Sequence, residues 1–534
     1  MNRKTLVLPA VVGLLAPVLA ACGGSGSGSG GTDAITVGTT DTFAATKDAP
    51  APLDPAYAYD VGTWNILRQT VQTLMIQPKG EGDPVPEAAQ SCGFTDSGNE
   101  RYACTLRDGL KFANGDKITA ADVKYSIDRA RAIKADSGVS ALLNTIDTVE
   151  TQGDNEVIFH LKTADATFPY KLSTPVAGIV NPADYEKNKL RDGFDIDGSG
   201  PYTLSADVKN DTIVKATFTK NPNYKGTLTV NNSKVDMISY ADADAMGKAL
   251  DKGDIDVMTR TMSPDQIQKL SASTDNNEDL VEMSGLEIRY LAFNTNAPSV
   301  KNKAVRQAMA QLINRGEIVS KVYGTQAEPL YSLVPASITG HSNSFFNKYG
   351  DPNTAKAKAL LTGANITTPV KLTLHYTTDH YGSATKKEFE ILQKQLNDSG
   401  LFDVTIQGSP WSAFVPAERK GKYDVWGMGW FPDFPDADNY LAPFLDKDNF
   451  LKSPYRNNRI IDTLIPASRR DADRIAAAGN LTTIQDIVAD DVPILPLWQG
   501  KQYVAARDDV TGTAYALNSS STLQLWELGR GVSG

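Results

Sequence analysis

Alternation of hydrophobic and polar residues predicts β-strands in two segments. The stretch AITVGTT alternates and is expected to open the fold as a strand. Residues 155–162, NEVIFHLK, also alternate and place Val157, Phe159 and Leu161 on one face. His160 falls on the opposite face, where we expect solvent contact rather than metal binding.

Three longer segments carry hydrophobic residues at the three- and four-residue spacing of an amphipathic helix. Residues 119–132 begin with Thr119 and have Asp122 three positions later, the arrangement of a capping box. Further helices are expected over 303–314 and over 386–400, which ends in a plausible C-cap glycine. Their apolar stripes are Val305, Ala308, Met309, Leu312 and Ile313, and Phe389, Leu392 and Leu396. We interpret these stripes as core faces rather than cofactor sites, and strand and helix signals are interleaved along the chain.

The N-terminal segment predicts export and a tether. Arg3 and Lys4 precede a short apolar run that two prolines interrupt, so residues 1–21 are expected to be a signal peptide. The end of the run, LAAC, resembles the lipobox of bacterial lipoproteins, which implies that Cys22 becomes the N-terminus and carries a lipid. An ordinary signal peptide with a chance cysteine is the alternative. Residues 22–33 are rich in Gly and Ser and predict a flexible tether that holds a folded body off the membrane.

Two further cysteines, Cys92 and Cys104, flank the turn residues DSGN. An exported chain meets an oxidising environment, which favours a disulfide that clamps a hairpin. A metal pair is disfavoured because no nearby histidine completes a ligand set. Two buried free thiols remain the alternative.

Composition and charge exclude two classes of partner. Removing Arg3 and Lys4 from the 53 basic residues leaves 51 against 63 acidic ones, a net charge of −12. Nucleic acid requires a basic surface and anionic membranes attract polybasic segments, so neither is expected to bind this surface. The length predicts roughly two to four domains. The chain contains 20 Tyr, 17 Phe and 6 Trp, enough to line a ligand cleft as well as to fill a core.

Residues 429–440, GWFPDFPDADNY, combine a large aromatic surface with three carboxylates and two stiffening prolines. The aromatic residues are Trp430, Phe431, Phe434 and Tyr440, and the acids are Asp433, Asp436 and Asp438. Taken alone, this pattern is compatible with a metal site, a catalytic acid pair, a solvated turn, or a pocket for a ligand that is both cationic and apolar.

Six motifs in order carry a resemblance to a known family. Residues 105–130, TLRDGLKFANGDKITAADVKYSIDRA, contain the spaced signature L-R-x-G-x-x-F-x-x-G-x-x-x-T-A-x-D-V. PLDPAYAYDVGTWNILRQ precedes it, and GSGPYTL, KNPNYKG, YLAFNTNAPSVKNKAVRQAMAQLINR and DVPILPLWQGKQYVA follow it. Over residues 36–528 the chain resembles the family 5 extracellular solute-binding proteins, the oligopeptide, dipeptide and nickel receptors of bacterial ABC importers.

The resemblance implies an α/β, two-lobed periplasmic-binding-protein type II (Venus-flytrap) fold with an additional subdomain inserted in lobe I. Lobe I would comprise 34–68, 166–290 and 498–534, the inserted subdomain 69–165, and lobe II 291–497. Because lobe II begins and ends at inter-lobe crossings, the resemblance implies that the two lobes can close on a ligand by a hinge motion.

The resemblance also implies a substrate-binding lipoprotein that captures peptides, expected to be oligopeptides, and delivers them to an ABC permease. We expect a monomer without cofactor or metal. Lipid on Cys22 would anchor it at the cell surface, on the outer face of the cytoplasmic membrane.

In peptide-binding members of the family, the loop G-W-x-x-D presents a carboxylate to the α-ammonium of the ligand, and here that residue is Asp433. A buried amine needs a fixed opposite charge because an unpaired buried charge is strongly unfavourable. The backbone from Gly429 to Phe431 is expected to pair with an extended peptide as an added strand. Trp430 is expected to cover apolar side chains or the ammonium.

The early loop corresponds to the surface that holds the ligand main chain from the lobe I side. The resemblance places Tyr59, Asp60 and Val61 there. Tyr57 and Trp64 are nearby aromatic residues that either line a side-chain pocket or pack in the core.

The sequence departs from the family pattern just before the Gly-Trp pair. Some peptide binders carry a basic residue there, whereas residues 425–429, VWGMG, carry no charge. Arg419 and Lys420 lie close in sequence and are candidates to substitute for it, but we expect them at the solvated tip of a hairpin. The sequence therefore favours a longer peptide, or one whose end lies outside the cleft, over a dipeptide.

The sequence was compared with the motifs of other functions, and these functions are disfavoured. His375 and His380 form an H-x-x-x-x-H without the Glu of H-E-x-x-H, and G-x-S-x-G and P-loop motifs are absent, so no enzyme is expected. The run DADNYL does not match an EF-hand loop, because Tyr440 stands where a calcium ligand is needed and Leu441 where glycine is needed. A structural calcium is a minor alternative. The main alternative is a non-peptide ligand on the same scaffold: an oligosaccharide, a nickel chelate, a haem or a siderophore. A surface lipoprotein that has lost its cleft is a third possibility.

Overall fold

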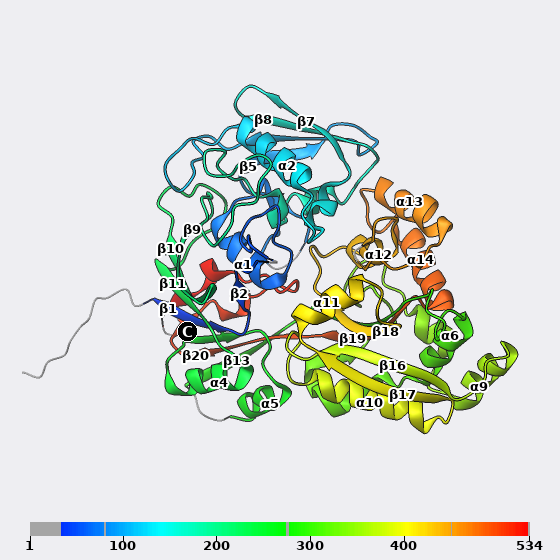
Figure 1. Cartoon of the computed structure of the whole chain (residues 1–534). Coiled ribbons are helices and arrows are strands. Elements are labelled where there is room, and N and C mark those ends of the chain that lie inside the picture. Colours follow the sequence, from blue (N-terminus) through cyan, green and yellow to red (C-terminus); the bar gives the residue numbers. More distant parts are fainter. Residues whose placement is uncertain (1–33, 48, 80–81, 274–276, 450, 532–534) are drawn as a thin grey trace, which may run out of the picture. The chain divides into compact units, whose positions relative to one another are not determined.

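The computed structural model describes residues 34–47, 49–79, 82–273, 277–449 and 451–531 (Figure 1). The predicted signal peptide, the tether and Cys22 lie outside these residues. Within the described ranges, no helix has both the length and the apolar composition that crossing a membrane requires.

An eight-stranded sheet combines strands from distant parts of the chain (Figure 1). Its order is β13-β20-β12-β1-β11-β10-β2, and β9 pairs with β10. The bounds are β1 Ile35–Thr39, β2 Phe43–Ala44, β9 Tyr202–Lys209, β10 Thr212–Lys220, β11 Lys234–Ser239, β12 Val257–Thr259, β13 Glu278–Met283 and β20 Gln502–Arg507. Strand β1 is parallel to both neighbours and mostly buried, as is usual for a parallel strand covered on both faces.

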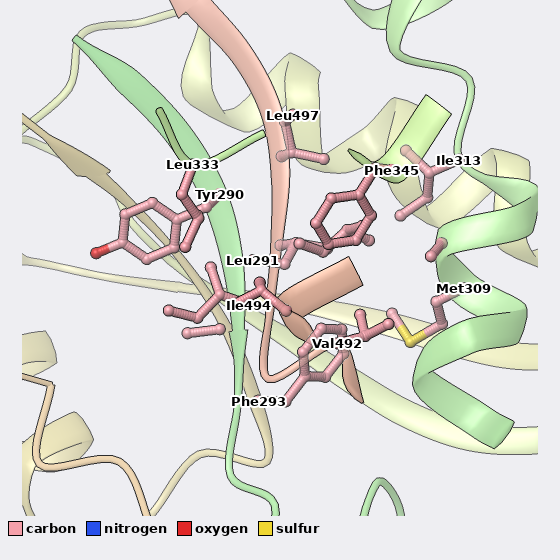
Figure 2. Packing of buried hydrophobic residues seen from close by; sticks show 14 of the residues in the cluster. Tyr290, Leu291, Phe293, Met309, Ile313, Leu333, Phe345, Val492, Ile494 and Leu497 are labelled. Carbon is pink, nitrogen blue, oxygen red and sulfur yellow. The ribbon is translucent and has the colours of Figure 1, made fainter. Parts of the chain in front are cut away.

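A six-stranded sheet has the order β15-β19-β14-β18-β16-β17. Its bounds are β14 Ile288–Phe293, β15 Ala327–Pro329, β16 Val370–Thr377, β17 Phe402–Ser409, β18 Val425–Trp430 and β19 Ile494–Gly500. Every residue of β14 and β18 is buried. In the core beside β14, Leu291 and Phe293 belong to the same buried cluster as Met309, Ile313 and Phe345 (Figure 2). This apolar burial is the main term that stabilises the sheet.

A four-stranded antiparallel sheet has the order β5-β6-β8-β7. Its bounds are β5 Ala89–Phe94, β6 Arg101–Leu106, β7 Ile146–Gln152 and β8 Glu156–Leu161. Cys92 on β5 lies directly opposite Cys104 on β6, and a disulfide joins them. Two short ribbons pair β3 Met75–Ile76 with β4 Val85–Pro86, and β21 Val510–Thr511 with β22 Gly529–Arg530.

The α-helices fall between these strands along the chain. Those before β14 are α1 Val61–Thr70, α2 Ala120–Ile133, α3 Phe168–Lys171, α4 Ala243–Lys252 and α5 Pro264–Ala272. Those between β14 and β19 are α6 Lys303–Leu312, α7 Arg315–Ile318, α8 Ser344–Tyr349, α9 Thr354–Gly363, α10 Thr385–Asp398, α11 Trp411–Arg419, α12 Asp438–Leu445, α13 Ile465–Arg470 and α14 Ala478–Asp491.

The chain passes between the two large sheets at two adjacent segments. Strand β13 leads to β14 through residues 284–287, and β19 leads to β20 through Lys501. A Cβ atom on Gly285 would lie 2.3 Å from the backbone oxygen of Gly500, so glycine is needed for this close approach. Two short adjacent connections are the geometry of a hinge. The domain limits given above remain a prediction.

The elements expected from periodicity are present. Helices α2, α6 and α10 cover the three predicted segments, and Thr119 and Asp122 form the capping box. Gly400 follows the C-cap of α10 with a φ of 69°, the left-handed conformation that glycine favours. Strands β1 and β8 cover the predicted strands, and the partly exposed His160 has its Nε2 3.2 Å from Oε2 of Glu150.

The Cys92→Ala/Cys104→Ala double variant is expected to lower the free energy of unfolding by about 2–4 kcal/mol. The disulfide links residues 12 positions apart, and its loss increases the entropy of the unfolded chain. Neither cysteine lines the cavity described below, so the ligand Kd should not change. Urea unfolding and ligand titration measure the two quantities, and a stability loss below about 1 kcal/mol would contradict the expectation.

Candidate ligand-binding site

A cavity of about 230 Å³ is lined from two sides. One side comes from the chain around the eight-stranded sheet and includes Tyr59, Asp60, Val61, Gly62, Trp64, Asn65, Arg68, Arg260 and residues 520–522. The other comes from the chain around the six-stranded sheet and includes His380, Tyr381, Trp411, Val415, Glu418, Arg419 and residues 428–433. Segments far apart in the sequence thus enclose one cavity.

The start of α1 positions the first wall. Asp60 caps the helix, since its Oδ1 accepts from Thr63 N at 2.9 Å and its Oδ2 accepts from Thr63 Oγ1 at 2.6 Å. The ring of Tyr59 lies 5.6 Å from that of Trp64. Trp64 is buried and donates from Nε1 to the backbone oxygen of Ala58 at 2.8 Å, so it both packs against the loop and lines the cavity.

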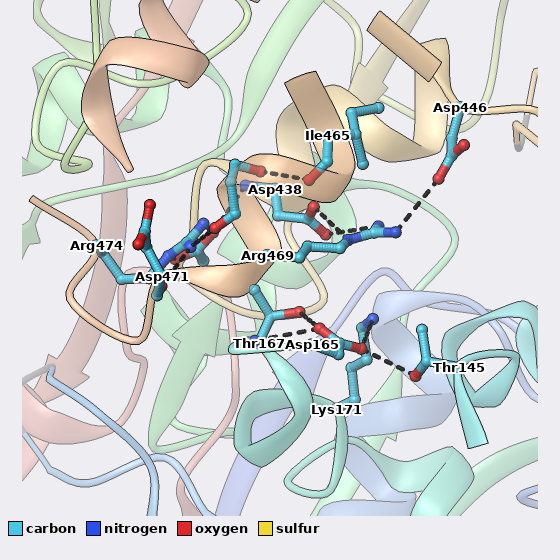
Figure 3. Close-up of polar contacts among 12 residues, drawn as sticks. Thr145, Asp165, Thr167, Lys171, Asp438, Asp446, Ile465, Arg469, Asp471 and Arg474 are labelled. Atoms are coloured by element: carbon cyan, nitrogen blue, oxygen red, sulfur yellow. Dashed lines mark hydrogen bonds and ion pairs between the residues drawn. The ribbon is translucent and has the colours of Figure 1, made fainter. Parts of the chain in front are cut away.

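The three carboxylates of residues 429–440 have different partners. Asp436 forms a bidentate pair with Arg474, at 2.7 and 2.9 Å. Asp438 forms a bidentate pair with Arg469, at 2.8 and 3.0 Å (Figure 3). Asp433 lines the cavity. Two of the three acids therefore serve the fold, and Asp433 is the one placed to meet a ligand.

The end of helix α13 contacts two segments from the first third of the chain. The backbone oxygen of Arg469 accepts from Ala166 N at 2.8 Å, and that of Arg470 accepts from Asn99 Nδ2 at 2.9 Å. Burial raises the pKa of Asp165, but the charges of Lys171 and Arg469 outweigh it and hold the pKa at about 2 (Figure 3). These contacts join the end of α13 to residues 99 and 166, and none of the bonded residues lines the cavity.

Asp433 is a buried carboxylate with neutral hydrogen-bond donors. It is 8% exposed, and its Oδ2 accepts from Asn439 Nδ2 at 2.9 Å and from the Tyr59 hydroxyl at 3.1 Å. Burial raises its pKa to about 6, although these hydrogen bonds and the charge of Arg68 act in the opposite direction. Arg68 lines the same cavity, and burial lowers its pKa to about 10. A nearby cationic ligand would stabilise the ionised form of this carboxylate, which burial disfavours.

Gly429 and Trp430 end β18, and Phe431 follows them. A Cβ atom on Gly429 would lie 2.1 Å from Nη1 of Arg289, so glycine leaves space for that guanidinium. Trp430 is 7% exposed and packs on Phe444, with ring centroids 5.2 Å apart. The backbone of this strand end pairs with β14 and borders the cavity.

Eight of the nine residues predicted for ligand binding line this cavity. They are Tyr59, Asp60, Val61, Trp64, Gly429, Trp430, Phe431 and Asp433. Tyr57 is not part of the lining; it is half-buried, and its backbone N donates to the oxygen of Asp54 at 2.9 Å. The binding role of all nine remains a prediction.

The sequence analysis did not predict several lining residues. Arg260 comes from the loop after β12, where its φ is 52°, and its Nη2 lies 3.0 Å from Oδ1 of Asp41. Nothing in the local sequence marks this loop as part of the site. By contrast, one face of α11 carries Trp411, Val415 and Glu418, which all line the cavity. Their spacing of four and three residues could have predicted that they share a helix face.

The expectation for Arg419 and Lys420 was wrong. They do not sit at the tip of a hairpin, because the apolar spacing of residues 411–415 forms helix α11, which Arg419 ends. Arg419 lines the cavity, and its Nη1 donates to the backbone oxygen of Asp136 at 3.1 Å. This contact also bridges the two sides of the cavity.

The two histidines of the H-x-x-x-x-H pattern have separate aromatic partners. His375 stacks on Tyr423 at 4.0 Å, and His380 stacks on Trp411 at 3.8 Å between ring centroids. Burial, together with the charges of Arg260 and Arg289, lowers the pKa of His380 to about 3. His380 is therefore a neutral aromatic wall at physiological pH.

A smaller cavity of about 130 Å³ adjoins the first. The two share Arg260, His380, Tyr381, Phe431 and Ser521 in their linings. The smaller cavity reaches Gly500 and Lys501, at one of the crossings between the large sheets. The two cavities together therefore extend from Asp433 toward the segments that cross between the large sheets.

Comparison with known families agrees with this geometry. The family model described as "Bacterial extracellular solute-binding proteins, family 5 Middle" matches residues 83–452. The chain is a family 5 bacterial extracellular solute-binding protein. The resemblance inferred from the six motifs is confirmed.

Relatives of this family 5 protein match it over most of their length. The oligopeptide-binding protein OppA of Bacillus subtilis (strain 168) is 25% identical over 508 residues, covering 90% of this chain and 91% of that protein. The murein tripeptide binding protein MppA of Escherichia coli has a TM-score of 0.80 at 23% identity, covering 93% and 98% of the two chains. The dipeptide binding protein of Pseudoalteromonas sp. SM9913, solved with Met-Leu, has a TM-score of 0.80 at 20% identity, covering 93% and 100%. These likenesses confirm the two-lobed α/β type II periplasmic-binding-protein fold.

Proposed function

We propose that this family 5 protein captures peptides in the cavity and delivers them to the membrane permease of an ABC transporter. The buried Asp433 carboxylate, beside the end of strand β18, carries the proposal. Relatives named for oligopeptide, murein tripeptide and dipeptide binding favour the same class of ligand.

The carboxylate suits the α-ammonium of a peptide. Among the described residues, both hydrogen bonds to Asp433 fall on Oδ2, which leaves Oδ1 to accept from a ligand. A charge-assisted hydrogen bond in a buried site is stronger than a neutral one. The ammonium would also restore the ionised state that burial of Asp433 disfavours.

The backbone of β18 supplies a second, sequence-independent contact. β18 pairs with β14 along its whole length, but it pairs with β16 only at Val425 and Trp426. In the part of the chain that the structure describes, the backbone beyond Trp426 has no strand neighbour on the β16 side. An extended peptide added along that edge would gain main-chain hydrogen bonds without any requirement for particular side chains.

The same proposal includes the remaining predicted partners. Lipid on Cys22 would anchor the protein at the outer face of the cytoplasmic membrane, and the two lobes of a monomer would close on the peptide. The family is extracellular by description, which is compatible with this placement.

Mass spectrometry of the purified and then denatured protein tests the proposal. We expect short peptides to be released in stoichiometric amounts. Release of a glycan, a haem, a siderophore or a nickel chelate without peptides would overturn the proposal in favour of the non-peptide alternative.

The affinity for a peptide with a free N-terminus is expected to rise about tenfold between about pH 5 and pH 7. Burial raises the pKa of Asp433 to about 6, so the empty site is mostly protonated at the lower pH and mostly ionised at the higher pH. The α-ammonium has an ordinary pKa of about 8 and keeps its charge over this range. Calorimetric titration at constant ionic strength measures the profile; an affinity that falls with rising pH would contradict the assignment.

A further inference from the structure

Glu418 is a second buried acid in the same cavity, and the function proposed above does not use it. It lies one residue before the end of α11, is 6% exposed, and lines the cavity with Asp433. Its Oε1 is fully buried and accepts no hydrogen bond from any described residue. A buried carboxylate oxygen without a donor is strongly unfavourable, so the site is incomplete without a further group.

Nearby protein cations do not complete it. Burial raises the pKa of Glu418 to about 7, although the charges of Arg419 and Lys452 act to lower it. Arg419 directs Nη1 to the backbone oxygen of Asp136, and Lys452 is exposed. Arg260, another cation of the lining, is paired with Asp41 at 3.0 Å. Among the described residues, Glu418 therefore has charges near it but no ion pair.

A second unsatisfied group lies near Glu418. The hydroxyl of Tyr290 is buried and has no hydrogen-bond partner among the described residues. The charge of Glu418 is among the causes that raise the pKa of Tyr290, after burial and the neighbouring Tyr381. Tyr290 lines neither cavity, so a ligand group would have to satisfy the Glu418 carboxylate itself, by donating hydrogen bonds to it.

The walls beside Glu418 are apolar. Trp411 and Val415 precede it on the same face of α11, and Met428 faces the cavity from β18. Such walls suit the methylene stem of a lysine or arginine side chain, whose charged end then reaches the carboxylate. A neutral aliphatic side chain would find the same walls but would leave Glu418 unpaired.

We propose that Glu418 is a specificity-determining residue that binds the cationic end of a basic ligand side chain, so that the protein prefers peptides containing lysine or arginine. The inference rests on the peptide-binding function proposed above and adds the class of peptide. Asp433 and Glu418 have separate roles: Asp433 binds the α-ammonium common to all peptides, and Glu418 distinguishes among side chains.

The test uses the full-length mature chain and three pairs of tripeptides. Each pair has lysine or the nearly isosteric, uncharged norleucine at one position, with alanine at the other two. We expect wild-type protein to prefer lysine over norleucine by about 10- to 100-fold in Kd at one position, the range for a hydrogen bond to a charged group. Glu418→Gln should abolish this preference while leaving the affinity for the norleucine peptides within about twofold.

Two control variants separate the possible results. Glu390→Gln, an exposed acid on α10, should retain the lysine preference, and melting curves should show that all variants fold. Asp433→Asn should weaken both members of each pair and preserve their ratio. The inference is overturned if wild-type protein binds lysine and norleucine peptides equally, or if Glu418→Gln keeps the preference or weakens both members alike. Failure of wild-type protein to bind any peptide would instead overturn the proposed function, and this inference with it.

Discussion

An Asp433→Asn variant is expected to bind tripeptides with a Kd about 30- to 1000-fold higher than wild type, a loss of about 2–4 kcal/mol. The substitution keeps the size of the side chain. The amide oxygen can still accept from Asn439 and Tyr59, which both contact Oδ2 in the wild-type protein. The amide NH2 then takes the place of Oδ1, so a donor replaces the acceptor that the α-ammonium needs.

Isothermal titration calorimetry measures this loss, and two controls isolate the charge. Asp403→Asn removes an exposed acid on β17 and should leave the Kd unchanged. N-acetylated peptides lack the ammonium and should bind the Asp433→Asn variant and wild type with similar, weak affinity. A change of less than about twofold for a free tripeptide would show that Asp433 does not hold the N-terminus.

Asp54→Ala is expected to lower the free energy of unfolding by about 3–5 kcal/mol. Asp54 forms a bidentate pair with Arg129 at 2.8 and 2.6 Å, and both side chains are almost fully buried. Asp54 also accepts from the backbone N of Ala56 and of Arg191. Truncation leaves the buried guanidinium without its counter-charge and two backbone donors without an acceptor.

Urea unfolding measures this loss, which should appear as a lower midpoint at an unchanged slope. Asp154→Ala, which breaks an exposed ion pair with Lys117 at 2.8 Å, is the matched control and should cause no measurable change. An Asp54→Ala loss as small as that of the control would contradict the expectation. Because Asp54 lies in the loop that leads to Tyr59, the ligand affinity should fall as well.

Local structure could be predicted from the sequence where one segment contains the whole signal. The apolar spacing of α6 and α10 identifies their buried faces without knowledge of what covers them. The capping box of α2 lies within four consecutive residues. The family followed from six motifs because glycines, prolines and apolar positions at turns and strand ends are constrained by local backbone geometry.

The chemistry of the site was only partly predictable. Residues 429–440 contain three aspartates whose neighbouring residues do not show which one faces a ligand. The family resemblance singled out Asp433. The structure distinguishes them because Arg474 and Arg469, more than 30 positions further along the chain, pair with Asp436 and Asp438. No pattern within the loop contains that information.

By itself, the sequence determined the family, the α/β class and the principal helices, since these depend on periodicity and on residues close together along the chain. The resemblance singled out Asp433, but only the tertiary structure showed that Glu418, Arg419 and Arg260 also face the cavity. Glu418 lies on helix α11 and Arg260 in the loop after β12, about 160 residues earlier in the sequence, and both line the same cavity. Whether a charged side chain is paired, exposed or left for a ligand depends on distant segments meeting in space, and burial then sets the energetic cost of leaving it unpaired.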